Sequence, residues 1–125
     1  MNFTLLPDTF AIVRMGAADE VPKWTDGGPF VSMTRTDSEL SIVCRERHVP
    51  AGAHADRGWQ CLKIEGPIPL NVVGVMAEVA SVLAKAGVSV FPIATYATDY
   101  VFVKGDQVAG AIDALRAAGH SVRRG

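Results

Sequence analysis

Three histidines are the first residues to consider for chemistry, because an imidazole can ligate a metal or act as a general acid or base. His48 and His54 lie six residues apart with Asp56 nearby, and His120 stands far from them in the sequence. The spacing differs from the helical H-x-x-x-H pair of a metal site, and Pro50 would break a helix that aligned the two rings. We expect no metal site and interpret the histidines as surface loop residues. An enzymatic role would require the first two histidines and Asp56 to converge on a cleft.

Candidate nucleophiles form no recognisable constellation either. No serine lies in a G-x-S-x-G motif; the serines are Ser32, Ser38, Ser41, Ser81, Ser89 and Ser121. Cys44 and Cys61 lie in apolar, strand-like segments without an electropositive neighbour, which favours buried reduced thiols over a disulfide or a metal site. The sequence has no Walker A or G-x-G-x-x-G loop, so we expect no cofactor and no enzymatic activity.

The composition limits the class of protein. The chain has 125 residues, of which 49% are hydrophobic and 20% charged, enough for one domain or two very small ones with a core. A net charge of -1 offers no basic field for nucleic acid. The apolar run 72–82 is too short to cross a bilayer, and the N-terminus lacks the basic and apolar regions of a signal peptide. We therefore expect a cytoplasmic protein that binds neither nucleic acid nor membrane.

The two tryptophans have different surroundings. Trp59 lies in an apolar alternating segment and is predicted to be in the core. Trp24 lies in a polar stretch, so a core position and a place at an interface or pocket rim both stay open.

The C-terminal half begins with a strand and a helix. Residues 59–65 alternate in the manner of a half-buried strand, and the glycine and prolines of 66–69 end it. Apolar residues then recur with helical spacing over 70–86. Asn71 is predicted to cap this helix and Gly87 to end it.

Two β-branched and aromatic runs follow and predict a hairpin. The runs cover 88–96 and 100–104, with a tight turn at 97–99. Pro92 lacks an N–H, so the first of these strands should lie at a sheet edge or have a bulge at this residue. A second helix over 105–118, with Asp106 as cap, and a short last strand from residue 120 complete the order β-α-β-β-α-β.

The N-terminal half reads as a shortened copy of the same plan. We predict a strand at 10–15, a hairpin of 29–34 and 39–44, and helical turns within 19–24 and 45–49. Thr36-Asp37 and Thr98-Asp99 each stand at a predicted hairpin turn, which is consistent with a repeat.

Several segments resemble a group of small bacterial proteins with two ACT-like units. They are residues 5–14, 34–44, 74–77, 86–91 and 95–103. The segments of the second half also resemble the ACT units of the animal cytosolic arginine sensors that regulate the TOR pathway. The resemblance covers roughly residues 3 to 119. Ala94 stands where the pattern has Ser, which removes one possible hydroxyl contact.

The resemblance implies an α+β protein of two fused ferredoxin-like βαββαβ ACT units, with a reduced unit in 1–58 and a complete unit in 59–125. It implies a non-catalytic regulatory or sensor protein that binds a small effector, an amino acid, at an interface between units. Because the chain has no output domain, a homodimer or a protein partner must carry the signal. The alternative is an interaction or assembly module with a vestigial pocket.

The resemblance also implies a set of ligand-binding residues. The start of the first helix, with Asn71, Val72 and Gly74, would offer free N–H groups to a carboxylate. Asp99 could accept hydrogen bonds from a cationic group, and likeness to the arginine sensors selects Thr95, Tyr96 and Asp99 as ligand contacts. Purely structural interpretations also stay open: Asp99 as a turn former, Gly74 as a helix–sheet packing contact, and Thr95 and Tyr96 as ordinary strand residues.

Overall fold

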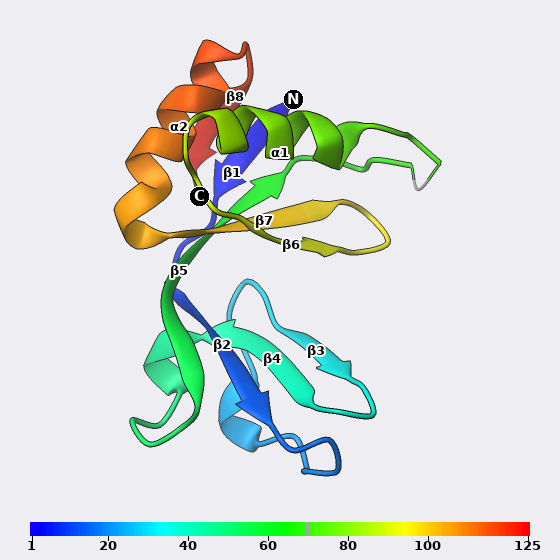
Figure 1. The fold of residues 1–125 in the computed structure, drawn as a ribbon, viewed down its shortest axis with the longest axis vertical. Helices are drawn as coiled ribbons and strands as arrows, with labels where there is room; N and C mark the ends of the chain where they lie inside the picture. Colours follow the sequence, from blue (N-terminus) through cyan, green and yellow to red (C-terminus); the bar gives the residue numbers. More distant parts are fainter. Residues whose placement is uncertain (70) are drawn as a thin grey trace. The chain divides into compact units, whose positions relative to one another are not determined.

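The chain folds into two compact units. The computed structural model describes residues 1–69 and 71–125. Unit 1 comprises Met1–Pro7 with Gln60–Gly125, and unit 2 comprises Asp8–Trp59 (Figure 1). The first seven residues thus belong with the C-terminal part of the chain, whereas we predicted a grouping of 1–58. Leu70, the first residue of the predicted helix 70–86, lies outside the described residues.

Unit 1 has the predicted β-α-β-β-α-β order. Its strands follow one another across the sheet as β6-β7-β5-β1-β8. The strands are β1 (Asn2–Leu5), β5 (Ala55–Ile64, in this unit from Gln60), β6 (Phe91–Ala94), β7 (Asp99–Lys104) and β8 (Ser121–Arg124), and the helices are α1 (Val75–Lys85) and α2 (Val108–Ala117). The strand β1, which we did not predict, runs antiparallel to β5 and parallel to β8. This pairing is the reason why the first seven residues belong to unit 1.

Both helices of unit 1 cover one face of its sheet, as Figure 1 shows. Alternate residues of each strand point to that face, and residues four apart on each helix meet them. The fully buried contributors are Phe3, Leu62, Ile64, Val101 and Val103 from the strands, with Val79, Leu83, Ala111 and Leu115 from the helices.

Neither helix begins with the cap that we predicted. The N-cap of α1 is Gly74, with a left-handed φ of 84°, and no side chain caps this helix. Asn71 lies before it in a turn. A 3₁₀ turn η3 (Gly105–Gln107) precedes α2, and no side-chain cap bond forms there either, so the prediction of Asp106 as a cap was wrong.

Three predictions about turns and edges are confirmed. Gly87 and Gly119 have φ of 75° and 94°, the left-handed conformation that ends a helix at low cost for glycine. Pro92 lies on β6, at the end of the strand order, where a missing N–H is tolerated.

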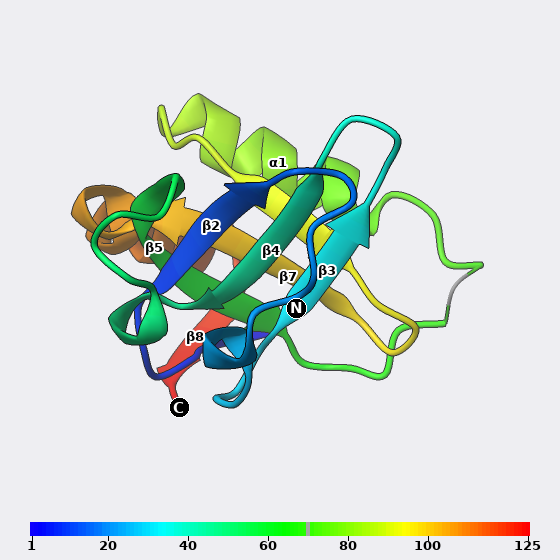
Figure 2. The same cartoon turned by 90° about the horizontal axis from the view of Figure 1, so that it is seen from below.

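Unit 2 is a smaller sheet in the order β3-β4-β2-β5 (Figure 2). Its strands are β2 (Phe10–Met15), β3 (Ser32–Arg35), β4 (Leu40–Arg45) and the first residues of β5, and its 3₁₀ turns are η1 (Lys23–Thr25) and η2 (Glu46–His48). The 3₁₀ turns form at the two places where we predicted helical turns. The core is made by Ala11, Val13, Leu40, Ile42, Cys44 and Val49. Trp59 is buried as predicted, and its Nε1 donates to Asp56 Oδ1 at 3.1 Å.

The hairpins of the two units share one register. Arg35 pairs with Leu40, and Ala94 pairs with Asp99, so a four-residue loop joins the strands in each. In both hairpins a 3₁₀ turn follows the second strand directly. Residues 32–49 and 91–108 therefore match position by position, offset by the 59 residues that separate Arg35 from Ala94.

A threonine organises each of these loops in the same way. The N–H groups of Thr36 and Thr95 donate to the carbonyls of Glu39 and Thr98, both at 2.9 Å. Each threonine Oγ1 also accepts the N–H of that last loop residue, at 3.2 and 3.3 Å. The counterpart of Thr36 is thus Thr95, whereas our alignment of the two Thr-Asp pairs matched it with Thr98. Asp99 begins β7 and lies outside the turn.

Candidate functional site

The segment between β5 and α1 forms a hollow beside the β6–β7 loop. This unit 1 hollow has a volume of about 450 Å³ and is lined by Pro67, Ile68, Pro69, Asn71, Tyr96 and Ala97. The N–H of Ile68 donates to the carbonyl of Ala97 at 2.8 Å. A Cβ on Gly66 would lie 3.1 Å from that carbonyl oxygen, so glycine permits the close approach of the two segments. The hollow brings together two of the six residues predicted to bind a ligand, Asn71 and Tyr96.

The other four predicted residues do not line this hollow. Nothing lies within 4 Å of a Cβ built on Gly74, so its left-handed φ, and no packing contact, accounts for the glycine. The hydroxyl of Thr95 is occupied in the loop, where it donates to the carbonyl of Thr98 at 2.8 Å. Val72 is half exposed, and Asp99 is partly buried at the start of β7.

The chemistry of the unit 1 hollow is mainly apolar. Prolines, Ile68 and Ala97 form its wall, and the amide of Asn71 and the phenol of Tyr96 are its polar side chains. Tyr96 is 87% exposed. Such a wall is suited to the hydrocarbon part of a ligand.

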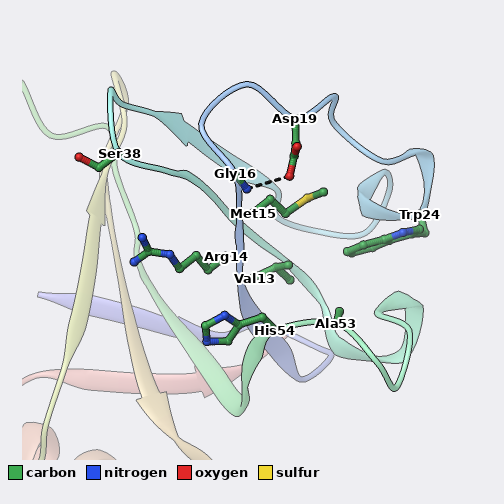
Figure 3. Close-up of a pocket in the computed structure, with 9 residues that line it drawn as sticks. All are labelled: Val13, Arg14, Met15, Gly16, Asp19, Trp24, Ser38, Ala53 and His54. Atoms are coloured by element: carbon green, nitrogen blue, oxygen red, sulfur yellow. Dashed lines mark hydrogen bonds between the residues drawn. The ribbon is translucent and has the colours of Figure 1, made fainter.

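Unit 2 has a hollow in the corresponding place, which the sequence did not reveal (Figure 3). This unit 2 hollow has a volume of about 460 Å³ and is lined by Val13, Arg14, Met15, Gly16, Asp19, Trp24, Ser38, Ala53 and His54. It follows the first strand of its unit and reaches the β3–β4 loop at Ser38, whose counterpart in the repeat is Ala97 of the unit 1 hollow. Trp24 lines the hollow and also packs against the core, so it takes both of the positions left open by the sequence.

Charged groups distinguish the unit 2 hollow. Figure 3 shows Asp19 directed at the backbone of Gly16, whose N–H it accepts on Oδ2 at 2.8 Å. The guanidinium of Arg35 donates to the carbonyls of Ala17 and Asp19 and so holds this loop. Arg14 and His54 are exposed, and the N–H of Arg14 donates to the carbonyl of His54 at 2.9 Å. Arg14, just before the end of β2, and Asp19, just after it, carry opposite charges. This pair is the sequence signal that could have indicated the unit 2 hollow.

Of the three side chains whose convergence an enzymatic role would require, two line one hollow. His54 and Asp56 line a second, neighbouring hollow of about 470 Å³ with Arg14 and Arg57, and His48 does not line it. Within residues 1–69 and 71–125, no three metal-ligating side chains of the His, Cys, Asp and Glu types form a group.

His120 corrects the expectation of a surface histidine. Its side chain is only 10% exposed. Its Nδ1 lies 2.7 Å from the N-terminal nitrogen, its Nε2 lies 3.4 Å from Glu78 Oε1, and its ring meets Phe3 edge-on at a centroid distance of 5.7 Å. The ring therefore joins β1, α1 and the start of β8.

Both cysteines are free and buried, as predicted. Burial raises the pKa of the Cys44 and Cys61 thiols. The neutral thiol is thus the stable form at neutral pH, and neither sulfur is activated as a nucleophile.

Comparison with known proteins places this geometry in a family. The family model of the ACT domain matches residues 54–117, and a model described as the N-terminal domain of a further family matches residues 8–52. No curated protein matches the chain. In the described part of the chain, no helix has the length and apolarity to cross a membrane.

Solved structures agree with this assignment. A protein of Agrobacterium tumefaciens is 36% identical, with a TM-score of 0.92 over 99% of this chain and 92% of that one. The aspartokinase alpha and beta subunits have a TM-score of 0.64 at 16% identity, over 95% of this chain and 97% of that one. The regulatory subunit of aspartate kinase from Thermus thermophilus has a TM-score of 0.60 at 12% identity, over 89% and 93%. At such identities the aspartate kinase structures show likeness of fold.

The predicted fold class is therefore confirmed as α+β with a ferredoxin-like ACT arrangement. The likeness to the arginine sensors stays a prediction. ACT domains are regulatory modules that typically bind small ligands and oligomerise. The chain belongs to the ACT domain family.

Proposed function

We propose that this protein is a cytoplasmic, non-catalytic regulator that binds an amino acid in the unit 1 hollow. The observation that carries the proposal is the position of Asn71 and Tyr96 on one hollow of about 450 Å³. This hollow lies within the segment that the ACT model matches, and small-molecule sites have volumes of this order.

The hollow and its surroundings would divide the recognition of an amino acid between them. The wall of Pro67, Ile68 and Pro69 would hold the apolar side chain of the ligand. The first turn of α1 has no side-chain cap, so its N–H groups can face a carboxylate arriving past Val72 and Gly74. Asp99 would receive the ammonium group.

Thr95 has a different part in this proposal. Because its hydroxyl is engaged within the loop, it acts as a positioning residue that fixes the backbone of Tyr96. The ring of Tyr96, which is 87% exposed, then lies at the edge of the hollow.

A second copy of the chain would complete the site. Val72, Val73 and Tyr96 are exposed by 48%, 90% and 87%, and the two valines follow directly on Asn71, which lines the hollow with Tyr96. Exposed large apolar groups near a hollow support an interface. We propose a homodimer whose formation, or whose affinity for a protein partner, shifts when the effector binds. The free cysteines are compatible with a reducing compartment.

The same exposed residues favour the alternative of an assembly module with a vestigial pocket. Val73 is the most exposed of them and does not line the hollow. An interface that needs no ligand would use these side chains equally well.

A thermal-shift titration with the twenty amino acids separates the two functions. An effector at 100 times its Kd stabilises the folded protein by about 2.7 kcal/mol. Asn71→Ala and Tyr96→Ala should abolish the shift, whereas Tyr96→Phe, which keeps the ring, should retain most of it. If no amino acid shifts Tm while sedimentation shows a stable dimer that Val73→Asp dissociates, the assembly module is the function.

A further inference from the structure

We infer that unit 2 carries an anion site, in the second hollow that His54 lines, for the phosphate group of a small phosphate monoester. This basic hollow has a volume of about 470 Å³ and is lined by Ile12, Arg14, His54, Ala55, Asp56 and Arg57. The inference goes beyond the amino acid site proposed for unit 1 and does not rest on it. It rests on two arginines and a histidine that line one hollow.

Arg14 and His54 face away from the acidic and apolar lining of the unit 2 hollow. Figure 3 shows both side chains on one side of β2, with those of Met15, Asp19 and Trp24 on the other. In the described part of the chain, neither the guanidinium of Arg14 nor the ring of His54 has a hydrogen bond or an ion pair. Their N–H groups are therefore available to a ligand in the basic hollow.

The backbone holds Arg14 in a fixed position. Arg14 stands within β2 and pairs with Ser41 of β4, and its N–H donates to the carbonyl of His54 at 2.9 Å. The same hydrogen bond fixes the backbone that carries the imidazole. A guanidinium on a rigid strand can bind a phosphate with two parallel hydrogen bonds.

A β-bulge in β5 brings the second arginine to the hollow. Two residues of β5, Arg57 and Gly58, stand opposite Ala11 alone on β2. Gly58 has the left-handed φ of 84° that this bulge requires, and its N–H donates to Glu46 Oε1 at 2.7 Å. Bulges redirect side chains and are frequent beside functional sites, and here the bulge contains the arginine that lines the hollow.

The remaining charged residues of the hollow are also held in place. The guanidinium of Arg57 donates to the carbonyl of Pro50 at 2.8 Å. Asp56, the acidic residue of the lining, accepts the indole N–H of Trp59 on Oδ1 at 3.1 Å. With two arginines against one aspartate, the lining has a net positive charge even when His54 is neutral.

A phosphate monoester matches this lining better than a carboxylate does. It carries a charge of about −2 near pH 7 and three strong acceptor oxygens, so it can accept hydrogen bonds from several side chains at once. A carboxylate offers one charge and two oxygens. Ile12 and Ala55 add an apolar surface for the organic part of the ester. Because the net charge of the chain is only -1, the ligand that fits is a small ester and not a nucleic acid.

Two-dimensional ¹H–¹⁵N NMR titrations of the full chain at constant ionic strength test this site. The probes are inorganic phosphate, phenyl phosphate and, as the matched carboxylate, benzoate. We expect both phosphates to shift the resonances of residues 12–14 and 54–58 along one saturating curve, with a Kd of about 1 mM or lower. Benzoate should bind about tenfold more weakly than phenyl phosphate, or worse. The absence of a saturable shift with either phosphate, or equal Kd values for benzoate and phenyl phosphate, overturns the inference.

Matched variants then assign the charges. Arg14→Gln should weaken the binding of phenyl phosphate about tenfold or more, and His54→Gln should weaken it less, because an imidazole has fewer N–H donors than a guanidinium. Arg47→Gln is the control, since it removes the same charge from an exposed side chain of unit 2 that does not line the hollow. Its Kd should stay within about twofold of the wild-type value. Equal Kd values for Arg14→Gln and Arg47→Gln would mean that only overall charge matters and would overturn the inference.

Gly58→Val tests whether the bulge positions Arg57, with every charge retained. A β-branched side chain is strongly disfavoured at a φ of 84°, so the bulge must rearrange, and we expect about tenfold weaker binding of phenyl phosphate. Gly52→Val, in the loop before β5, is the control, because a Cβ on Gly52 meets nothing within 4 Å and its φ is not left-handed. An unchanged Kd in Gly58→Val would overturn the assigned role of the bulge.

The same titrations keep this site distinct from the one proposed for unit 1. Tyr96→Ala should leave the binding of phenyl phosphate unchanged, and Arg14→Gln should leave a thermal shift by an amino acid unchanged. If an amino acid shifts Tm but neither phosphate shifts residues 12–14 and 54–58, the proposed function stands and this inference is wrong. If Arg14→Gln abolishes phosphate binding while no amino acid shifts Tm, this inference stands and the effector site proposed for unit 1 is wrong.

Discussion

The two units start from the same hairpin and then diverge at one buried valine. Val49 and Val108 occupy matching positions after the 3₁₀ turns η2 and η3, and they are 7% and 6% exposed. After Val108 the chain continues as α2, whereas after Val49 it meets Pro50 and Gly52, which are poor helix formers. A single turn closes there, with the N–H of Ala53 donating to the carbonyl of Pro50 at 3.1 Å.

The loss of a helix changes what each unit can recognise. In unit 1 two helices cover the sheet, and prolines from the segment between β5 and α1 line the hollow. Unit 2 covers its sheet with short turns and the Trp24 ring, and the loop after its first strand carries Asp19. The comparison indicates that a shared hairpin fixes the place of the hollow, while the segment after the first strand determines its chemistry.

The largest expected effect tests whether α2, which has no counterpart in unit 2, stabilises the core of unit 1. Leu115→Ala removes a fully buried side chain of α2, and we expect it to lower the free energy of unfolding by about 3 kcal/mol. Asp113→Ala, on the exposed side of the same helix, should stay within about 0.5 kcal/mol. Urea unfolding followed by circular dichroism measures both. A loss below about 1 kcal/mol for Leu115→Ala would contradict the view that α2 closes the core.

The matched valines allow a direct comparison of the two units, with a smaller expected loss of stability. Val49→Ala and Val108→Ala each remove two methyl groups from a core, which costs about 1–2 kcal/mol. Alanine is the better helix former by up to about 0.7 kcal/mol, so part of the loss at Val108, which begins α2, is recovered. We expect Val49→Ala to be the more destabilising in parallel urea titrations. A larger loss at Val108 would show that the two positions are not equivalent.

The sequence predicted well where one periodicity dominated. The six elements of unit 1 from β5 to β8 follow from alternation, helical spacing and glycine stops. In unit 2, β2 was predicted at its observed bounds, Phe10–Met15. The strand β1 was missed because Asn2–Leu5 is too short to show a pattern. Its place between β5 and β8 depends on pairing with residues about sixty and one hundred and twenty positions away.

The candidate sites were harder to predict than the fold. Asn71 and Tyr96 meet at a hollow because the backbone of Ile68 binds that of Ala97, a contact that neither segment signals alone. The unit 2 hollow was missed because its lining comes from five segments: β2, its following loop, η1, the β3–β4 loop and the residues before β5. Asp99 was misplaced in the turn because Thr and Asp are frequent turn residues, and the hydrogen bonds of Thr95 set the loop one residue earlier.

The loop threonines test whether the shared hairpin is stabilised in the same way in both units. Thr36→Val and Thr95→Val remove the hydroxyl hydrogen bonds within each loop, and we expect a loss of about 1 kcal/mol for each. The loss should be the larger at Thr95, whose bonds are partly buried while those of Thr36 are exposed. Thr→Ser at either position retains the hydroxyl and should cost less. Unfolding titrations in which the valine and serine variants are equal would refute the role of the hydroxyl.

The smallest effect concerns β1, which pairs with both β5 and β8 in the sheet of unit 1. Thr4 on β1 donates to Glu65 Oε1 at 2.5 Å, and this hydrogen bond lowers the pKa of the Glu65 carboxyl group, with smaller contributions from the charges of Lys63 and Arg123. The pKa of Glu65 is lower in the folded state than in the unfolded chain. The ionised carboxylate therefore stabilises the fold above the unfolded pKa, and this contribution is lost as the pH falls through the folded pKa. Thr4→Val should therefore raise the pKa of Glu65 toward its ordinary value and reduce the loss of stability on acidification, whereas Thr4→Ser should preserve both. Carbon-detected NMR titration of the Glu65 carboxyl group measures the pKa, and an unchanged value in Thr4→Val would assign the lowering to Lys63 and Arg123.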